Sequence, residues 1–205
     1  MRRPLTYYDD AGQAFPIYLT VVAGLLFLAL VYLAVGQAAA TRNGAQTAAD
    51  AAALAAAQDT RDQLTGQWVK DVLDPAKWQD IFDADVPVDP SCGRADQLAG
   101  RNGAHVEACT PKGPLGYRVD VRTDKPVGDS IVPGTERTYA KAHATAVIEP
   151  LCTFELPSGK VPGGKAGGHA LPRLTCKDRD WDLDPHDLTD LPGPEDLFDV
   201  HLAAD

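Results

Sequence analysis

The stretch AGQAFPIYLTVVAGLLFLALVYLAVGQAAATRNGAQTAADAAALAAA, residues 11–57, decides the fold of this chain. It contains no charged residue from Ala11 to Thr41, and an alanine-rich run without proline follows at once. Because both parts favour helix and nothing between them breaks one, the stretch predicts a single long helix with an apolar first half.

The apolar core of this helix, Phe15 to Val35, has the length of a membrane span. At 1.5 Å per residue it extends over about 31 Å, close to the roughly 30 Å of a hydrocarbon core. Pro16 stands in the first turn, where its missing N–H is tolerated, and Tyr18 and Tyr32 lie near the two headgroup zones. The sequence therefore predicts one transmembrane helix over residues 11–41.

Two alternatives to a membrane span stay open at this point. A cleaved secretory signal is suggested by Ala38-Ala39-Ala40 and by Arg2 and Arg3 at the start. Its apolar region normally has about 7–15 residues, however, and Asp9 and Asp10 stand where that signal is basic. The other alternative is a buried helix of a soluble protein.

All four cysteines follow the apolar segment, which favours an oxidising compartment for the C-terminal part. Basic residues flank the segment on both sides, so the distribution of positive charge does not decide its orientation in the membrane. The position of the cysteines does, and it predicts a cytoplasmic N-terminus. We expect the disulfides Cys92–Cys109 and Cys152–Cys176, because each closes a local loop, although four cysteines allow two other connectivities. The absence of any C-x-x-C pair disfavours a thiolate zinc site.

The charge of the chain is concentrated in its tail. The net charge is −10, and residues 177–205 contain ten acidic and two basic side chains. No basic patch for phosphate is visible, which excludes a general nucleic-acid surface and a basic stripe for anionic lipid.

Hydrophobic periodicity predicts an α+β fold after the span, with the long helix packed on a small antiparallel sheet. The helix is expected to continue to about residue 73, and a second helix to begin at Asp74-Pro75. Their predicted buried side chains are Leu64, Trp68 and Val72 in the first and Trp78, Ile81 and Phe82 in the second.

Two strands are expected over residues 116–122 and 137–148, joined through residues 126–134 as an antiparallel pair. The first turns Tyr117, Val119 and Val121 inward, and the second has an alanine face that lets a helix lie close: Ala140, Ala142, Ala144 and Ala146. A third strand is expected near residues 151–156. Residues 86–114 are predicted to be loop, 157–168 a linker, and the acidic tail disordered.

Small residues recur at every fourth position across the joint: Gly36, Ala40, Gly44, Ala48, Ala52 and Ala56. Such a row lets a neighbouring helix approach closely, and it wraps around the helix by about 40° per step. The alternative is that alanine fills an exposed rod because of its high helix propensity.

Few residues suggest chemistry. Alternating carboxylates make Asp178, Asp180, Asp182 and Asp184 weak Ca²⁺ candidates, but the glycine and glutamate of an EF-type loop are missing at the required places. The five histidines show no ligand spacing, and no nucleophile or phosphate-binding motif is present. We therefore expect no catalytic residues, no cofactor, no metal and no small-molecule substrate.

Two short motifs flank the span: Ala11-Gly12-Gln13-Ala14 before it, and the run AADAAALAAA at residues 48–57 after it. Together they resemble the TadE/TadG-like proteins of Flp (tight adherence, type IVb) pilus assembly, over roughly residues 10–60. The resemblance implies a bitopic envelope protein that acts as a minor pilin, a pseudopilin or an anchor of pilus biogenesis. Its implied partners are membrane lipid and other pilus-assembly or envelope proteins.

The chain departs from this family in two respects. Substrates of the prepilin peptidase have glutamate five residues after the cleavage-site glycine, whereas Ile17 stands there after Gly12. The D-x-S-x-S motif of larger TadG-type members is also missing.

The predicted organisation has five parts: a cytoplasmic tail (1–10), a transmembrane helix (11–41), a helical stalk (42–73), a disulfide-linked α+β ectodomain (74–156), and a linker with an acidic tail (157–205). The predicted function is a non-catalytic structural component of pilus assembly or of the cell envelope. The alternative function is an extracytoplasmic binding module whose acidic tail holds Ca²⁺ or a basic partner.

Overall fold

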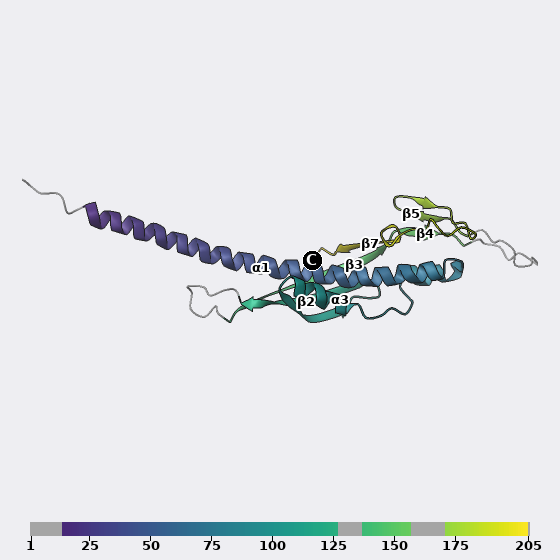
Figure 1. The fold of residues 1–205 in the computed structure, drawn as a ribbon, viewed down its shortest axis with the longest axis horizontal. Helices are drawn as coiled ribbons and strands as arrows, with labels where there is room; N and C mark the ends of the chain where they lie inside the picture. The colour runs from purple at the N-terminus through teal and green to yellow at the C-terminus, as the bar shows by residue number, and fades with distance from the viewer. Residues whose placement is uncertain (1–13, 127–136, 157–170, 205) are drawn as a thin grey trace, which may run out of the picture.

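A computed structural model describes residues 14–126, 137–156 and 171–204 of the chain. Its main element is α1 (Ala14–Lys70), an uninterrupted helix of about 86 Å at 1.5 Å per residue. In Figure 1 the first part of α1 stands free, and the second part lies along the remaining elements. We call residues 15–44 the free half of α1, and residues 45–70 with the described residues after them the head. The predicted long helix is confirmed, and it ends at Lys70, slightly before the expected position.

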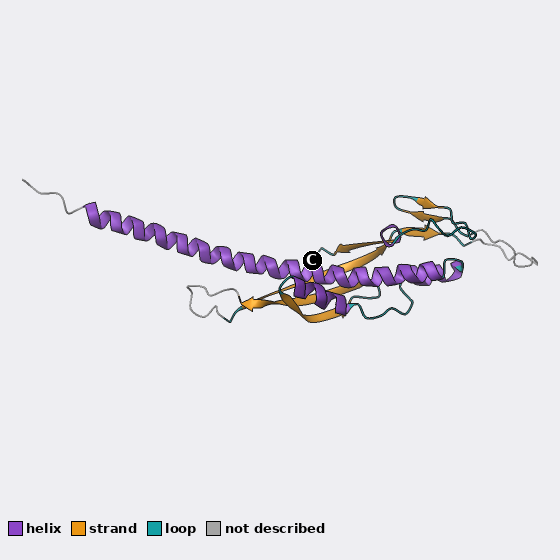
Figure 2. Cartoon of the chain, viewed as in Figure 1, coloured by secondary structure: helices purple, strands orange, loops and turns teal. Residues whose placement is uncertain are grey.

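The described part of the head contains short helices and strands, shown by type in Figure 2. They are η1 (Pro75–Lys77), α2 (Trp78–Phe82), α3 (Cys92–Arg101), β1 (Ala104–Pro111), β2 (Gly116–Pro126), β3 (Tyr139–Pro150), β4 (Cys152–Phe154), β5 (Leu174–Cys176), β6 (Asp180–Trp181), α4 (Pro194–Leu197) and β7 (Phe198–Leu202).

The strands form two antiparallel sheets. The larger has the order β1-β2-β3-β7, and the smaller has the order β4-β5-β6. The predicted pairing of β2 with β3 is confirmed, and so is the α+β class. The inward side chains of β2, namely Tyr117, Val119 and Val121, are buried as expected.

Alanines form the contact between α1 and the larger sheet. On the helix, Ala45, Ala48, Ala49, Ala52, Ala53, Ala56 and Ala57 have no exposed surface, and we call this set the alanine face. On β3, Ala144 and Ala146 are buried in the same core. The Gln46 side-chain amide donates a hydrogen bond of 3.1 Å to the backbone oxygen of His143, so the helix reaches the strand backbone directly. Side chains of one carbon on both surfaces allow this close approach.

Aromatic rings fill the core at the far end of α1. Trp68 packs against Trp78, which also contacts Phe154, and Phe82 lies between Phe154 and Phe198. The ring centroids are 5.2–6.0 Å apart, within the range of favourable aromatic pairs. The two predicted apolar stripes are therefore confirmed as core, together with Leu64, Val72 and Ile81.

A buried hydroxyl network sets the position of α1 between these two regions. Thr60 is fully buried, and its Oγ1 lies 2.8 Å from the hydroxyl of Ser91. The same Oγ1 donates a hydrogen bond of 2.9 Å to the Tyr117 hydroxyl. Because a buried hydroxyl needs a partner, these bonds link α1, the start of α3 and β2 in one arrangement.

Two disulfides join elements within the head, and their connectivity is the one that the sequence favours. Cys92–Cys109 joins α3 to β1, and Cys152–Cys176 joins β4 to β5 at directly opposed positions. Each closes a local loop and stabilises the head by about 3 kcal/mol on loop-closure grounds. None of the cysteines is free.

The prediction of an irregular loop over residues 86–114 was wrong. This segment contains α3, whose Ala95 and Ala99 are fully buried, and β1, which pairs with β2. A shift in the register of β1 between Val106 and Ala108 interrupts its alternation of inward and outward side chains, so the period of two is lost in the sequence.

The prediction of a disordered acidic tail was also wrong for the described residues after 170. Residues 174–202 contain β5, β6, α4 and β7, and β7 extends the larger sheet by pairing with β3. Leu174, Leu197 and Phe198 are fully buried, while most carboxylates of the tail lie at the surface. A few large apolar side chains and one disulfide thus order a segment whose composition is mainly acidic. The expected linker falls largely on residues 157–170, outside the described residues.

The head joins three of the five predicted parts of the chain. Residues 45–70 of the expected stalk share one core with residues 74–156 and with the tail. The predicted cytoplasmic tail, residues 1–10, lies outside the described residues.

We predict that Ala52→Leu destabilises the head by about 1–3 kcal/mol, because three extra carbons on the alanine face force α1 away from the sheet. The matched control is Gln58→Leu, which places the same side chain on an exposed position of α1 and is expected to change stability by about 0.5 kcal/mol or less. Urea unfolding in detergent, followed by tryptophan fluorescence, measures both. Equal stability of the two variants would contradict the close contact.

We predict that Phe198→Ala destabilises the head by about 3–5 kcal/mol, the usual effect of removing a fully buried phenyl group. Leu202→Ala in the same strand removes a side chain that is 38% exposed and is expected to have an effect of about 1 kcal/mol or less. The same unfolding measurement distinguishes them. A tail without fixed structure would tolerate both changes equally.

Candidate functional site: the free half of α1 and its entry into the head

The free half of α1 exposes large apolar side chains on every side. Phe15, Tyr18 and Tyr32 are 71%, 70% and 84% exposed, and the leucines and valines between them are similarly uncovered. This helix is long and apolar enough to cross a membrane, and none of its most apolar 18-residue window is buried. A buried core helix is therefore excluded, because a core helix is covered by its own protein. Such a surface needs lipid or a protein partner to cover it.

The row of small residues serves two different surfaces. Ala48, Ala52 and Ala56 are buried in the alanine face, whereas Gly36, Ala40 and Gly44 are exposed. The division falls where the head begins, since α1 has no buried residue over 15–44; steps of about 40° also turn the row by about 200° between its ends. At Gly36 and Gly44 an added Cβ would meet nothing within 4 Å. Packing within the head therefore does not require glycine at these two positions. We call Gly36, Ala40 and Gly44 together the exposed small face.

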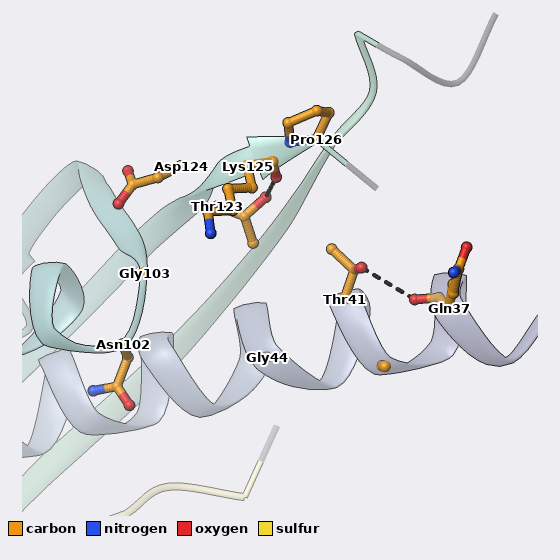
Figure 3. A pocket seen from close by; sticks show the side chains of 10 residues that line it. Gln37, Thr41, Gly44, Asn102, Gly103, Thr123, Asp124, Lys125 and Pro126 are labelled. Carbon is orange, nitrogen blue, oxygen red and sulfur yellow. Dashed lines mark hydrogen bonds between the residues drawn. The ribbon is translucent and has the colours of Figure 1, made fainter. Parts of the chain in front are cut away.

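A cleft lies where α1 enters the head, and Ala40 and Gly44 of the exposed small face are part of its lining (Figure 3). Its volume is about 680 Å³, and residues of α1 form one wall. The opposite wall comes from the turn after α3 and the end of β2; the lining residues are Gln37, Ala40, Thr41, Gly44, Asn102, Gly103, Thr123, Asp124, Lys125 and Pro126.

Several polar groups of the cleft bond locally. Thr41 donates a hydrogen bond of 3.1 Å to the backbone oxygen of Gln37, and Thr123 donates one of 2.8 Å to that of Lys125. Asp124 lies 2.9 Å from the imidazole of His105. The cleft begins two residues after the apolar core ends at Val35, so it opens at the depth of lipid headgroups if that core spans a bilayer.

The four candidate Ca²⁺ ligands of the tail have separate environments. Asp182 accepts two hydrogen bonds from Arg173, at 2.8 and 2.7 Å, and this contact lowers the pKa of Asp182. Asp184 accepts the backbone N–H of His186 at 2.8 Å, and Asp180 belongs to β6. Within the described residues these aspartates are not among the groups of side chains that could hold a metal ion together.

A network of charges crosses the outer surface of the larger sheet, and sequence reasoning missed it. Glu107 accepts hydrogen bonds from Lys141 and lies 3.3 Å from Arg122, which in turn donates to His105. Lys141 is the main cause of the lowered pKa of Glu107, and Arg122 adds to it. The alternation of charged residues along β2 was the only signal of this network in the sequence. Glu107 could not be placed beside it, because the segment that contains β1 was predicted to be loop.

Histidines other than His105 lie apart from the cleft. His186 and His201 are exposed in the tail, and His143 lies on β3 with its backbone oxygen bound by Gln46. His169 lies outside the described residues. The geometry thus brings together a membrane-length apolar surface, an exposed small face and a cleft.

Residues 12–59 match the family model described as putative Flp pilus-assembly TadE/G-like. These residues form a TadE/G-like module. The module covers the free half of α1 and all of the alanine face, and it agrees with the resemblance seen over residues 10–60. The match to this family model supports a role in Flp pilus assembly. None of the curated proteins and none of the solved structures compared with the chain matches it.

Proposed function

We propose that this chain is a membrane-anchored structural component of Flp pilus assembly, comparable to a minor pilin or a pseudopilin, and that it has no catalytic activity. The continuity of α1 carries the proposal. One helix contains both the uncovered apolar surface and the alanine face, with no break at the joint. A head attached in this way keeps a fixed direction relative to whatever covers the free half.

We place the N-terminus in the cytoplasm and the head on the opposite side of the membrane. The support is that all four cysteines lie in the head and pair with one another, which an oxidising compartment permits. The cytosol keeps thiols reduced, and the head would then lack both of its covalent links.

The exposed small face is the surface we assign to contact with other pilus-assembly proteins. Glycine and alanine at i, i+4 and i+8 let another helix approach the backbone of α1 closely. Lipid covers the remaining apolar surface of the free half. The departure at Ile17 fits an anchor that stays uncleaved.

Deletion of the gene is expected to reduce piliation and secretion of the major pilin, and the wild-type gene is expected to restore both. In the complemented strain, Ala40→Leu is expected to weaken recovery of pilus-assembly proteins with the tagged chain by about tenfold, equivalent to about 1.4 kcal/mol. Ala38→Leu is the matched control, because Ala38 is also exposed but lies about 160° away around the helix.

Normal piliation in the deletion strain would contradict the proposed role. Equal recovery with Ala40→Leu and Ala38→Leu would contradict the assignment of the exposed small face while leaving the role itself standing. Abundance of each variant in the membrane fraction is measured in parallel, so that loss of protein is not counted as loss of contact.

The orientation predicts how the cysteines react in intact cells. A membrane-impermeant thiol reagent is expected to label the chain only after a membrane-impermeant reductant has opened the disulfides. A Thr6→Cys variant is the control, and its added thiol is expected to react only in permeabilised cells. Labelling of the native cysteines without any reductant, and only after permeabilisation, would place the head in the cytosol.

A further inference from the structure

Three metal-ligand side chains meet on the paired strands β3 and β7, away from the free half of α1. Glu149 stands directly opposite Asp199, and His201 follows two residues later on β7. Alternate residues of a strand point to the same face, so the register itself brings Asp199 and His201 beside Glu149. One ligand atom of each lies within 4.8 Å of the other two.

The pairing of two carboxylates at opposed positions is unusual. Like charges directly across an antiparallel pair are destabilising. Within the described residues no lysine or arginine forms an ion pair with Glu149 or Asp199, and the only basic group in contact is His201, whose Nδ1 lies 3.1 Å from Asp199. A bound cation between the three side chains would remove this repulsion.

We propose that Glu149, Asp199 and His201 form a zinc site at the edge of the larger sheet, with water as the fourth ligand. Imidazole nitrogen and carboxylate oxygen are both ordinary zinc ligands, at about 2.0–2.2 Å. Ligand atoms at that distance from a tetrahedral ion stand about 3.4 Å apart, so the 3.1 Å between His201 and Asp199 is already close to the required spacing. Their side chains are about half exposed, 45% and 50%, and rotation can bring Glu149 nearer.

The donor set decides which cation fits. Ca²⁺ takes six to eight oxygen ligands, and Mg²⁺ keeps most of its water, whereas a nitrogen ligand favours a transition metal. No thiolate competes for zinc, because all four cysteines are in disulfides. This site is therefore different from the alternating aspartates at residues 178–184, and it does not depend on the proposed membrane function.

The site would tie the C-terminal strand to the rest of the sheet. β7 is an edge strand of five residues, and it carries the buried Phe198 beside two of the proposed ligands. A cation held by β3 and β7 together binds the folded head and not the unfolded chain. Zinc is thus expected to raise the thermal stability of the head in a concentration-dependent way.

Titration calorimetry of the full-length chain in detergent, with disulfides intact and zinc chloride as the titrant, tests the proposal. We expect one zinc ion per chain, and no comparable binding of calcium chloride at the same concentrations. His201→Gln and Glu149→Gln are each expected to weaken zinc binding by about tenfold or more, since even the loss of a side chain that hydrogen-bonds to a metal ligand lowers metal affinity by about that much.

His186→Gln is the matched control, because His186 is another exposed histidine of the tail with carboxylates nearby in the sequence. It is expected to bind zinc like the wild type. Failure of the wild type to bind zinc would overturn the proposal, and so would unchanged affinity in both site variants or an equal loss in His186→Gln. Circular dichroism checks that each variant is folded, and the two site variants lie on different strands, so misfolding of one leaves the other decisive.

Discussion

The close contact between the alanine face of α1 and the alanines of β3 is the constraint on which the rest of the head depends. Larger side chains at this contact would lift the helix from the sheet and would leave Gln46 unable to reach the backbone of His143. With the helix so close, Thr60 meets Ser91 and Tyr117, and Trp68 enters the aromatic cluster. Alanine buries little apolar area, so the contact itself contributes modest stability. The aromatic cluster and the two disulfides supply what the alanines do not.

This contact also explains how one helix can serve two environments. Alanine has the highest helix propensity. The helix therefore continues unbroken from the free half, which the rest of the chain does not cover, into the part that packs on the larger sheet. The turn of the small-residue row by about 40° per step directs Gly36, Ala40 and Gly44 away from the face that packs on β3. The same residue types therefore meet the sheet on one side, and on the other Ala40 and Gly44 line the cleft. No hinge is needed between the free half and the head.

Local patterns predicted the parts of the fold that rest on local physics. The long helix, the stripe through Leu64 and Trp68, and the alternation along β2 each repeat with a period that the sequence displays. The disulfides could be favoured because each closes a short loop. The tail could not be predicted in this way, since β7 gains its order from pairing with β3, about 50 residues earlier, and from burying Phe198. For the site, the small-residue row was visible, but only the position of the sheet shows which residues remain exposed.

The TadE/G-like module ends within α1, close to the point where the contacts of the helix with the head change in kind. The match ends at residue 59, and the next residue, Thr60, begins the hydroxyl network that fixes α1 against α3 and β2. The module thus contains the membrane-length surface, the exposed small face and the whole alanine face. The side chains that lock α1 in one position, Thr60 and Trp68, lie beyond it. The residues after the module therefore add the directional bonds and the large buried ring that hold this head on α1 in one position.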